Sequence, residues 1–167
     1  MTYPYPWQRF YGKVPHSLSY PAITLYQAVA ATAARVPESV AWDFLDTTSN
    51  YRDFLAAIDQ CADALAALGV ATGERILISM PTSPQGVIAF YAANKLGAVP
   101  ALIHPLSTAP EIEHYLNASR ARIALTLDAF YDRFAGIKPT LPLETLILAR
   151  IPDYLSPLKK FGFWLTK

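Results

Sequence analysis

Short apolar runs alternate with segments of helical periodicity along most of this chain, and this order constrains the fold more than any other feature. The runs expected to form strands lie at 40–45, 75–80, 98–103, 123–127 and 146–148. Helices are expected at 25–35, from Asn50 to Gly69, from Ser83 to Gly97, after Thr108 and at 128–134. Parallel neighbours need a crossover, which is usually a helix. The sequence therefore predicts an α/β fold with a mostly parallel sheet and helices on both faces.

Helix-capping residues mark several of these boundaries. Thr24 precedes Gln27 by three residues, and Thr108 precedes Glu111 by three, which is the spacing of a capping box. Asn50 is placed to cap a long helix, and the apolar face of that helix comprises Phe54, Leu55, Ile58, Cys61, Ala62, Leu65 and Leu68. The helix after Thr108 is expected to turn three residues inward, namely Ile112, Tyr115 and Leu116.

Composition divides the chain into three parts. Residues 24–150 carry the alternating pattern and are expected to form one α/β subdomain. Residues 1–23 are rich in Tyr, Pro and Trp without a period, which favours an extended arm lying over the body, anchored by Tyr3, Tyr5, Trp7, Phe10 and Tyr11. Residues 151–167 contain prolines and exposed-looking aromatics without a clear period. We interpret them as a connecting segment.

The charge balance restricts the partners. The formal net charge is +1, from 14 Lys and Arg against 13 Asp and Glu, so a nucleic acid is not an expected partner. Hydrophobic residues make up 53% of the chain and charged residues only 16%. This is apolar for a soluble domain. We therefore expect part of the surface to meet another protein segment, and the same surface is compatible with a homo-oligomer.

The sequence also favours a cytoplasmic protein. No apolar run approaches the roughly 18 residues of a membrane-spanning helix, and the first residues do not resemble a secretory signal. The single cysteine, Cys61, has no partner for an internal disulfide. Peripheral membrane association is not expected, although residues 159–164 combine cations and aromatics.

Residues with catalytic or metal-binding chemistry are few. The 7 glycines form no glycine-rich phosphate loop, and the 3 histidines lack further ligands at metal spacing. Glu111 and Asp128 are explained as helix-cap residues, and Cys61 as a core residue. Ser83 and Ser107 have no His–Asp companions at recognisable spacing. We therefore predict no catalytic residue and no metal site in this chain.

His104 is the one residue that we name as a candidate for binding a cofactor. It follows the strand predicted at 98–103, and ligands of parallel sheets collect beyond the carboxyl ends of the strands. The other ends at this edge are residues 80–83 and 127–128. The alternative is a purely structural histidine that donates a hydrogen bond to a loop carbonyl.

Four segments together resemble the acyl-CoA synthetase type of the adenylate-forming, AMP-binding superfamily. Residues 48–55 (TSNYRDFL) are similar to the signature that opens its first large helix. Residues 67–81 and 83–99, followed by His104-Pro105 and residues 111–116, resemble the next conserved passages. The similarity covers about residues 15–127, in the family's order and spacing.

The resemblance implies a function and a place in a larger enzyme. Members activate a carboxylate with ATP to form an acyl-adenylate, then transfer the acyl group to coenzyme A, with Mg²⁺ accompanying the nucleotide. This chain would be the first subdomain of the large N-terminal domain, and its main partner would be the remainder of its own enzyme.

The family's nucleotide-binding elements have no counterpart in this sequence. Its phosphate loop, adenine-lining motif, ribose-binding aspartate and lid lysine normally follow the region present here. We therefore expect the chain alone to bind no cofactor and to be inactive, and the sequence does not specify which carboxylic acid is activated. A self-standing, non-catalytic binding module with the same fold is the alternative. The aromatics at 154–164 separate the two hypotheses, because only a self-standing module should bury them in its own core.

Overall fold

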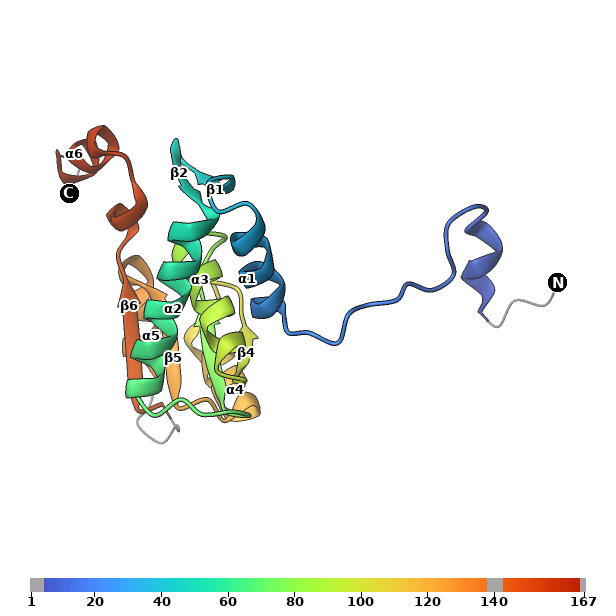
Figure 1. Cartoon of the computed structure of the whole chain (residues 1–167). Helices are drawn as coiled ribbons and strands as arrows, with labels where there is room; N and C mark the ends of the chain where they lie inside the picture. The colour runs from blue at the N-terminus through green and yellow to red at the C-terminus, as the bar shows by residue number, and fades with distance from the viewer. Residues whose placement is uncertain (1–4, 138–142, 166–167) are drawn as a thin grey trace.

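A parallel sheet forms the centre of the computed structural model, which describes residues 5–137 and 143–165 (Figure 1). Its four strands lie in the order β4-β3-β5-β6, with bounds Arg75–Ser79 (β3), Val99–Leu102 (β4), Ile123–Leu127 (β5) and Thr145–Ala149 (β6). All three neighbouring pairs are parallel. The predicted parallel α/β sheet is confirmed.

Helices cover both faces of this sheet, and the side chains of the central strands alternate between them. Ile76 and Ile78 of β3 pack with α2 (Tyr51–Ala67) and α3 (Pro84–Lys95), while α1 (Leu25–Arg35) packs against these two helices from outside. Leu77 points to the opposite face, where α4 (Ala109–Ser119) and α5 (Tyr131–Ala135) bury their own apolar residues. Burial on both faces explains why the strands are almost wholly apolar.

The predicted helix caps are present. Thr24 and Gln27 form a capping box at α1, Thr108 and Glu111 form one at α4, and the Asn50 side chain accepts a hydrogen bond from the Asp53 N–H at the start of α2. Ser83 caps α3 in the same way through the Gly86 N–H. These caps fix the residue at which each of the four helices begins.

Two residues predicted to point inward are exposed. Ile112 and Leu116 of α4 are fully buried, but Tyr115 is 40% exposed and its ring lies edge-on to His114. Leu68 is 46% exposed, because α2 ends at Ala67 and the chain turns away there. A seven-residue apolar face on α2 was therefore too wide a prediction, since Leu55 and Cys61 are also only partly buried.

A two-stranded hairpin precedes α2. Strand β1 (Val40–Phe44) was expected, whereas β2 (Thr47–Asn50) was not, because its four residues are polar and show no apolar alternation. The strands are antiparallel, and Leu45 and Asp46 join them with φ values of 50° and 65°. Two consecutive positive φ angles are typical of a tight hairpin turn. The hairpin is separate from the parallel sheet.

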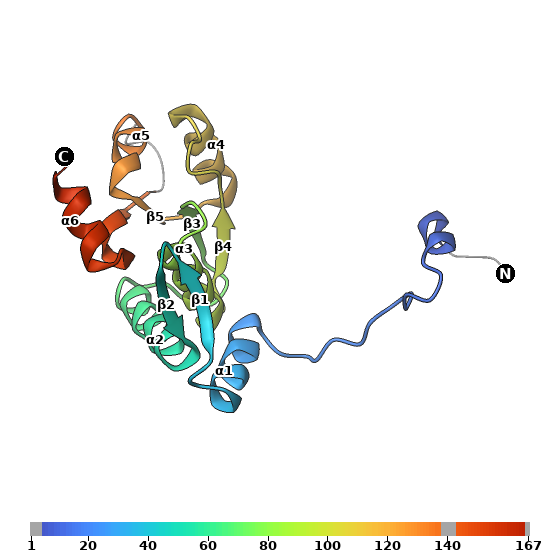
Figure 2. The ribbon, with the colours of Figure 1, turned by 90° about the horizontal axis from the view of Figure 1, so that it is seen from above.

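The N-terminal arm, here residues 5–23, extends away from the body in both views (Figures 1 and 2). Apart from a short 3-10 helix, η1 (Pro6–Phe10), it is irregular, and hydrogen bonds from the N–H groups of Gln8, Tyr11 and Val14 all end within the arm. The expectation that it lies over the body is wrong, since Trp7 is 54% exposed and Phe10 75%. Tyr3, another expected anchor, lies outside the described residues.

The C-terminal segment is more regular than expected. It contains a 3-10 helix, η3 (Ile151–Tyr154), and a nine-residue helix, α6 (Pro157–Leu165). Pro157 is the first residue of α6, a position that tolerates proline, so the proline that suggested an irregular segment starts a helix instead. The Lys159 ammonium ties α6 to the hairpin through the Asp46 carboxylate (2.6 Å) and the Leu45 carbonyl (3.1 Å).

Candidate functional site at the carboxyl edge of the sheet

The three loops predicted to meet at the carboxyl edge do lie at one end of adjacent strands. Residues 80–83 follow β3, residues 103–106 follow β4, and residues 127–128 lie at the end of β5. After β3 the chain enters α3 on one face. After β5 it enters η2 (Asp128–Phe130) and then α5 on the other. Neighbouring strands whose connections diverge leave a crevice between them, where ligands of such sheets bind.

Two buried hydroxyl groups lie at this divergence and were not singled out from the sequence. Ser79 ends β3, pairs in register with Thr126 of β5, and both are fully buried. The Thr126 hydroxyl donates a hydrogen bond to the Ser79 carbonyl (3.0 Å), whereas Oγ of Ser79 has no hydrogen-bond partner among the residues that the structure describes. A polar residue near the end of an otherwise apolar strand was the available signal for both.

His104 lies in the exposed loop after β4, where it shapes a turn. Its Nδ1 accepts a hydrogen bond from the Leu106 N–H (3.1 Å), and its carbonyl accepts one from the Ser107 N–H (3.0 Å). The structural alternative, in which the ring donates to a loop carbonyl, is therefore wrong in its direction. A neutral imidazole that accepts at Nδ1 carries its proton on Nε2, so Nε2 is the nitrogen that can donate to a ligand.

Arg133 of α5 holds the same loop from the opposite side. Its guanidinium donates hydrogen bonds to the carbonyls of Leu106 (2.6 Å) and Ser107 (3.1 Å). At the start of α4, the backbone N–H of Thr108 and then its hydroxyl hold the pKa of Glu111 below its usual range, with a smaller contribution from His104. The loop is thus fixed by α4 and α5, and Glu111 acts as the predicted cap.

The remaining candidate residues have structural roles. The Asp128 carboxylate accepts a hydrogen bond from the Ala129 N–H (2.9 Å) in the first turn of η2. Cys61 packs against the core, where burial raises the pKa of its thiol, as expected of a structural cysteine. Among the residues that the structure describes, no group of His, Cys, Asp and Glu side chains is arranged to hold a metal ion.

An apolar trough runs along the carboxyl edge between α3, the end of β3 and β4. Its main cavity has a volume of about 380 Å³, and none of the described residues that line it is Lys, Arg, Asp, Glu or His. A cavity of about 100 Å³ adjoins it beneath the hairpin, and Thr82 and Val87 line both. We use "trough" for these two cavities, whose lining includes Trp42, Phe44, Met80, Thr82, Val87, Phe90, Tyr91, Leu102 and Ile103. Such a lining suits hydrocarbon or a protein segment and offers nothing to neutralise a phosphate.

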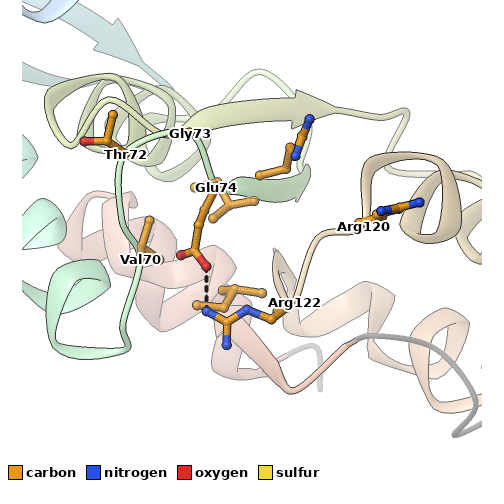
Figure 3. Close-up of a pocket in the computed structure, with 9 residues that line it drawn as sticks. Val70, Thr72, Gly73, Glu74, Arg120 and Arg122 are labelled. Atoms are coloured by element: carbon orange, nitrogen blue, oxygen red, sulfur yellow. Dashed lines mark hydrogen bonds and ion pairs between the residues drawn. The ribbon is translucent and has the colours of Figure 1, made fainter.

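The amino edge of the sheet has the opposite character. A cavity of about 390 Å³ lies there, and Figure 3 shows Glu74 and Arg122 pointing toward one another across it. Arg122 bonds Glu74 (2.7 Å) and Glu144 (2.8 Å), while Arg120 points away from the Glu74–Arg122 pair. The Ala71 N–H and then Arg122 lower the pKa of Glu74. Two carboxylates thus offset the charge of Arg122, while Arg75 and Arg120 also line the cavity.

Comparison with known proteins identifies the family. The model of the "AMP-binding enzyme" family matches residues 29–158. The long-chain-fatty-acid–CoA ligase of Bacillus subtilis is 28% identical over 163 residues, which are 97% of this chain and 29% of the ligase.

Solved structures agree with this assignment. The long-chain-fatty-acid–CoA ligase FadD1 of Archaeoglobus fulgidus superposes with a TM-score of 0.73 at 25% identity, covering 80% of this chain and 28% of FadD1. The inhibitor-bound N-terminal domain of FACL13 from Mycobacterium tuberculosis gives 0.68 at 27% identity, covering 75% of this chain and 33% of that domain. The chain thus spans about a third or less of each relative, and it belongs to the AMP-binding enzyme family.

Proposed function

We propose that this chain is the first part of an ATP-dependent, AMP-forming acyl-CoA ligase that acts in the cytoplasm. The observation that carries the proposal is the family match over residues 29–158, combined with relatives named as CoA ligases that extend well beyond it. Within such an enzyme, residues 24–150 are the first α/β subdomain. Within the described part of the chain, no helix is both long enough and apolar enough to cross a membrane.

The residues of this chain do not fit ATP with Mg²⁺ by themselves. Among the described residues, no cation lines the trough at the carboxyl edge, and no cluster of His, Cys, Asp and Glu could hold a metal ion. Stabilising charge that develops on a reacting phosphate requires cations or N–H donors placed beside it. We therefore assign no step of adenylation to this chain, and the remainder of the enzyme would supply the charged groups and metal ligands that bind ATP, Mg²⁺ and coenzyme A.

The C-terminal aromatics support a part of a larger enzyme over a self-standing module. Tyr154 packs edge-on against Trp42 with ring centroids 5.6 Å apart. By contrast Leu158, Phe161 and Trp164 on α6 are 81%, 63% and 64% exposed. A self-standing module should bury these side chains, whereas a subdomain presents them to the chain that follows.

A chimera tests the proposal directly. The corresponding first segment of the Bacillus subtilis ligase is replaced by this chain, and pyrophosphate release and acyl-CoA formation are measured with ATP, Mg²⁺, coenzyme A and a panel of fatty acids. The chimera is expected to be active, while the purified chain alone releases no pyrophosphate. Pyrophosphate released by the chain alone, or a folded chimera without ligase activity, contradicts the proposal.

The same chimera tests His104, which we retain as the residue of this edge proposed to contact a cofactor. His104→Gln is expected to lower kcat/KM about tenfold or more, as loss of a donor to a charged ligand group does. His114→Gln is the matched control, because His114 is an exposed histidine on α4. Equal activity of the two variants would contradict a contact with the cofactor and would leave His104 only its structural role in the turn.

A further inference from the structure

The cavity at the amino edge of the sheet is bordered by more positive than negative charge. Its lining includes Arg75, Arg120, Arg122 and Glu74. Arg122 is held between Glu74 (2.7 Å) and Glu144 (2.8 Å). Arg75 and Arg120 are exposed, and within the described part of the chain neither guanidinium forms an ion pair or a hydrogen bond. Two uncompensated guanidinium groups therefore border one cavity of about 390 Å³.

The fold places these two groups on the same face of the sheet. Arg75 is the first residue of β3, and alternation along the strand puts it on the side of Leu77, the face that α4 covers. Arg120 directly follows α4. Figure 3 shows its side chain pointing away from the Glu74–Arg122 pair, so its charge is not committed to that pair. A ligand in the cavity can thus recruit both groups without moving the backbone.

The backbone of Arg120 is in a conformation that its side chain does not favour. Arg120 caps the C-terminus of α4 with φ 55° and ψ 33°, in the left-handed region where glycine is the usual residue. A cation at a helix C-terminus gains only a small interaction with the helix dipole, which is less than the cost of this conformation. The end of α4 alone therefore does not explain an arginine here, whereas a use for its charge does.

We propose that this cavity binds a small molecule with a diphosphate group, which Arg75 and Arg120 hold together with part of the Arg122 guanidinium. A guanidinium presents five N–H donors in a planar fork that matches the oxygens of a phosphate, and such charge-assisted bonds are the strong ones. The cavity also has the size of a small-molecule pocket. Free pyrophosphate and a nucleoside diphosphate share this group.

The site is separate from the carboxyl edge, where the trough and His104 lie. The proposal is therefore independent of the proposed ligase function. Glu74 has a defined part in it, because its carboxylate occupies one side of Arg122 and repels an anion in the same cavity. A neutral side chain at position 74 should strengthen binding.

Titration calorimetry of the full 167-residue chain tests the proposal. Sodium pyrophosphate, ADP and inorganic phosphate are titrated separately without Mg²⁺, at an ionic strength held constant with NaCl. Pyrophosphate is expected to bind with a Kd below about 1 mM, and inorganic phosphate at least about tenfold more weakly, because it leaves one guanidinium without a partner. ADP that binds more tightly than pyrophosphate identifies a nucleoside diphosphate as the ligand, and ADP that binds more weakly identifies free pyrophosphate.

Two arginine variants locate the site. Arg75→Gln and Arg120→Gly should each raise the Kd for pyrophosphate about tenfold, the effect of losing a charged hydrogen-bond donor. Arg120→Gly should not lower the Tm, because glycine adopts the left-handed conformation readily, so its weaker binding cannot result from unfolding. Arg35→Gln is the matched control, since Arg35 is an exposed arginine in the last turn of α1 and does not line the cavity.

Glu74→Gln supplies a test of opposite sign. It should lower the Kd for pyrophosphate several-fold, because Arg122 is then freed from a competing carboxylate.

Any of four results overturns the proposal. They are no binding of pyrophosphate up to about 10 mM, which is weaker than a specific site, equal affinity for phosphate and pyrophosphate, equal weakening by Arg35→Gln and the two cavity variants, and weaker binding by Glu74→Gln.

Discussion

The amino edge of the sheet ends in paired charges, whereas the carboxyl edge ends in an apolar trough. At the amino edge, Arg122 bridges Glu74 and Glu144. At the carboxyl edge, the buried hydroxyl of Ser79 has no partner within residues 5–137 and 143–165, and Leu102 is largely exposed. The difference indicates that the charged amino edge can remain exposed to solvent, whereas the apolar carboxyl edge is suited to packing against another surface.

The largest effect is expected at a glycine of the amino edge. Gly97 has a φ of +70°, and a Cβ there would lie 3.0 Å from Cγ2 and 3.1 Å from Oγ1 of Thr72. Gly97→Ala should therefore lower the free energy of unfolding by about 2 kcal/mol, as measured by urea unfolding. Gly86→Ala, at the carboxyl edge, is the comparison.

A Cβ on Gly86 would lie 3.3 Å from both the Met80 Cβ and the Pro81 carbonyl oxygen. Because Gly86 is in α3, the roughly 1 kcal/mol gain in helix propensity offsets that crowding, and a change near zero is expected. An equal loss of unfolding free energy in the two alanine variants would show that a Cβ is tolerated equally poorly at both edges.

A smaller effect is expected from the paired hydroxyls of the carboxyl edge. Thr126→Val removes the hydrogen bond to the Ser79 carbonyl at nearly constant shape and should cost about 1 kcal/mol of unfolding free energy. Ser79→Ala removes a hydroxyl without a partner and should be neutral or slightly stabilising. If Ser79→Ala is the more costly of the two in urea unfolding, Oγ of Ser79 has a partner after all.

The smallest effect is a pH dependence at the amino edge. The pKa of Glu74 is lowered in the folded chain from its ordinary value of 4.5, so its contribution is present above that pH and is lost as the pH falls through the folded pKa. Glu74→Gln should lower the Tm at pH 7, and its difference from wild type should shrink as the pH falls through the lowered pKa of Glu74.

Added salt distinguishes the contribution of Glu74 to stability from that of Glu111, the capping carboxylate at the carboxyl edge. Because the Glu74–Arg122 pair is only partly shielded from water, 0.5 M NaCl should shrink the Glu74→Gln difference. Glu111→Gln removes the charge, but its Oε1 can still accept the capping hydrogen bond from the Thr108 N–H, so its difference from wild type should respond less. Equal responses to salt would contradict the distinction.

Local sequence rules predicted the body of the molecule well. The strand at 123–127 and the helix at 25–35 have the predicted bounds, because local caps and uninterrupted apolar runs decide them. Strand β2 was missed since polar Thr47 to Asn50 are held by pairing with β1, which is a tertiary effect. Helix α6 was missed because residues 151–167 contain prolines and show no clear period, although Pro157 is its first helical residue.

The site was predictable only in its location. Parallel order brings the three expected loops together, and that follows from the alternating pattern. The pairing of Ser79 with Thr126 depends on strand register, and the trough depends on how closely α3 approaches β3. Neither is encoded within a short window of sequence. The exposure of Trp7 and Phe10 depends on where the arm lies relative to the body, which no local pattern reports.

A proline in the edge strand β4 disfavours aggregation through strand pairing. It is an outer strand of the sheet, and the N–H groups of Val99 and Ile103 both donate inward to β3. Because backbone groups alternate in direction along a strand, those of Pro100 and Leu102 point away from β3. Proline has no N–H, so only Leu102 can donate at this edge. An incoming strand that tried to extend the sheet at this edge would find half of the expected donors missing. The chain can thus leave its apolar carboxyl edge open for a specific partner without inviting strands from unrelated molecules along β4.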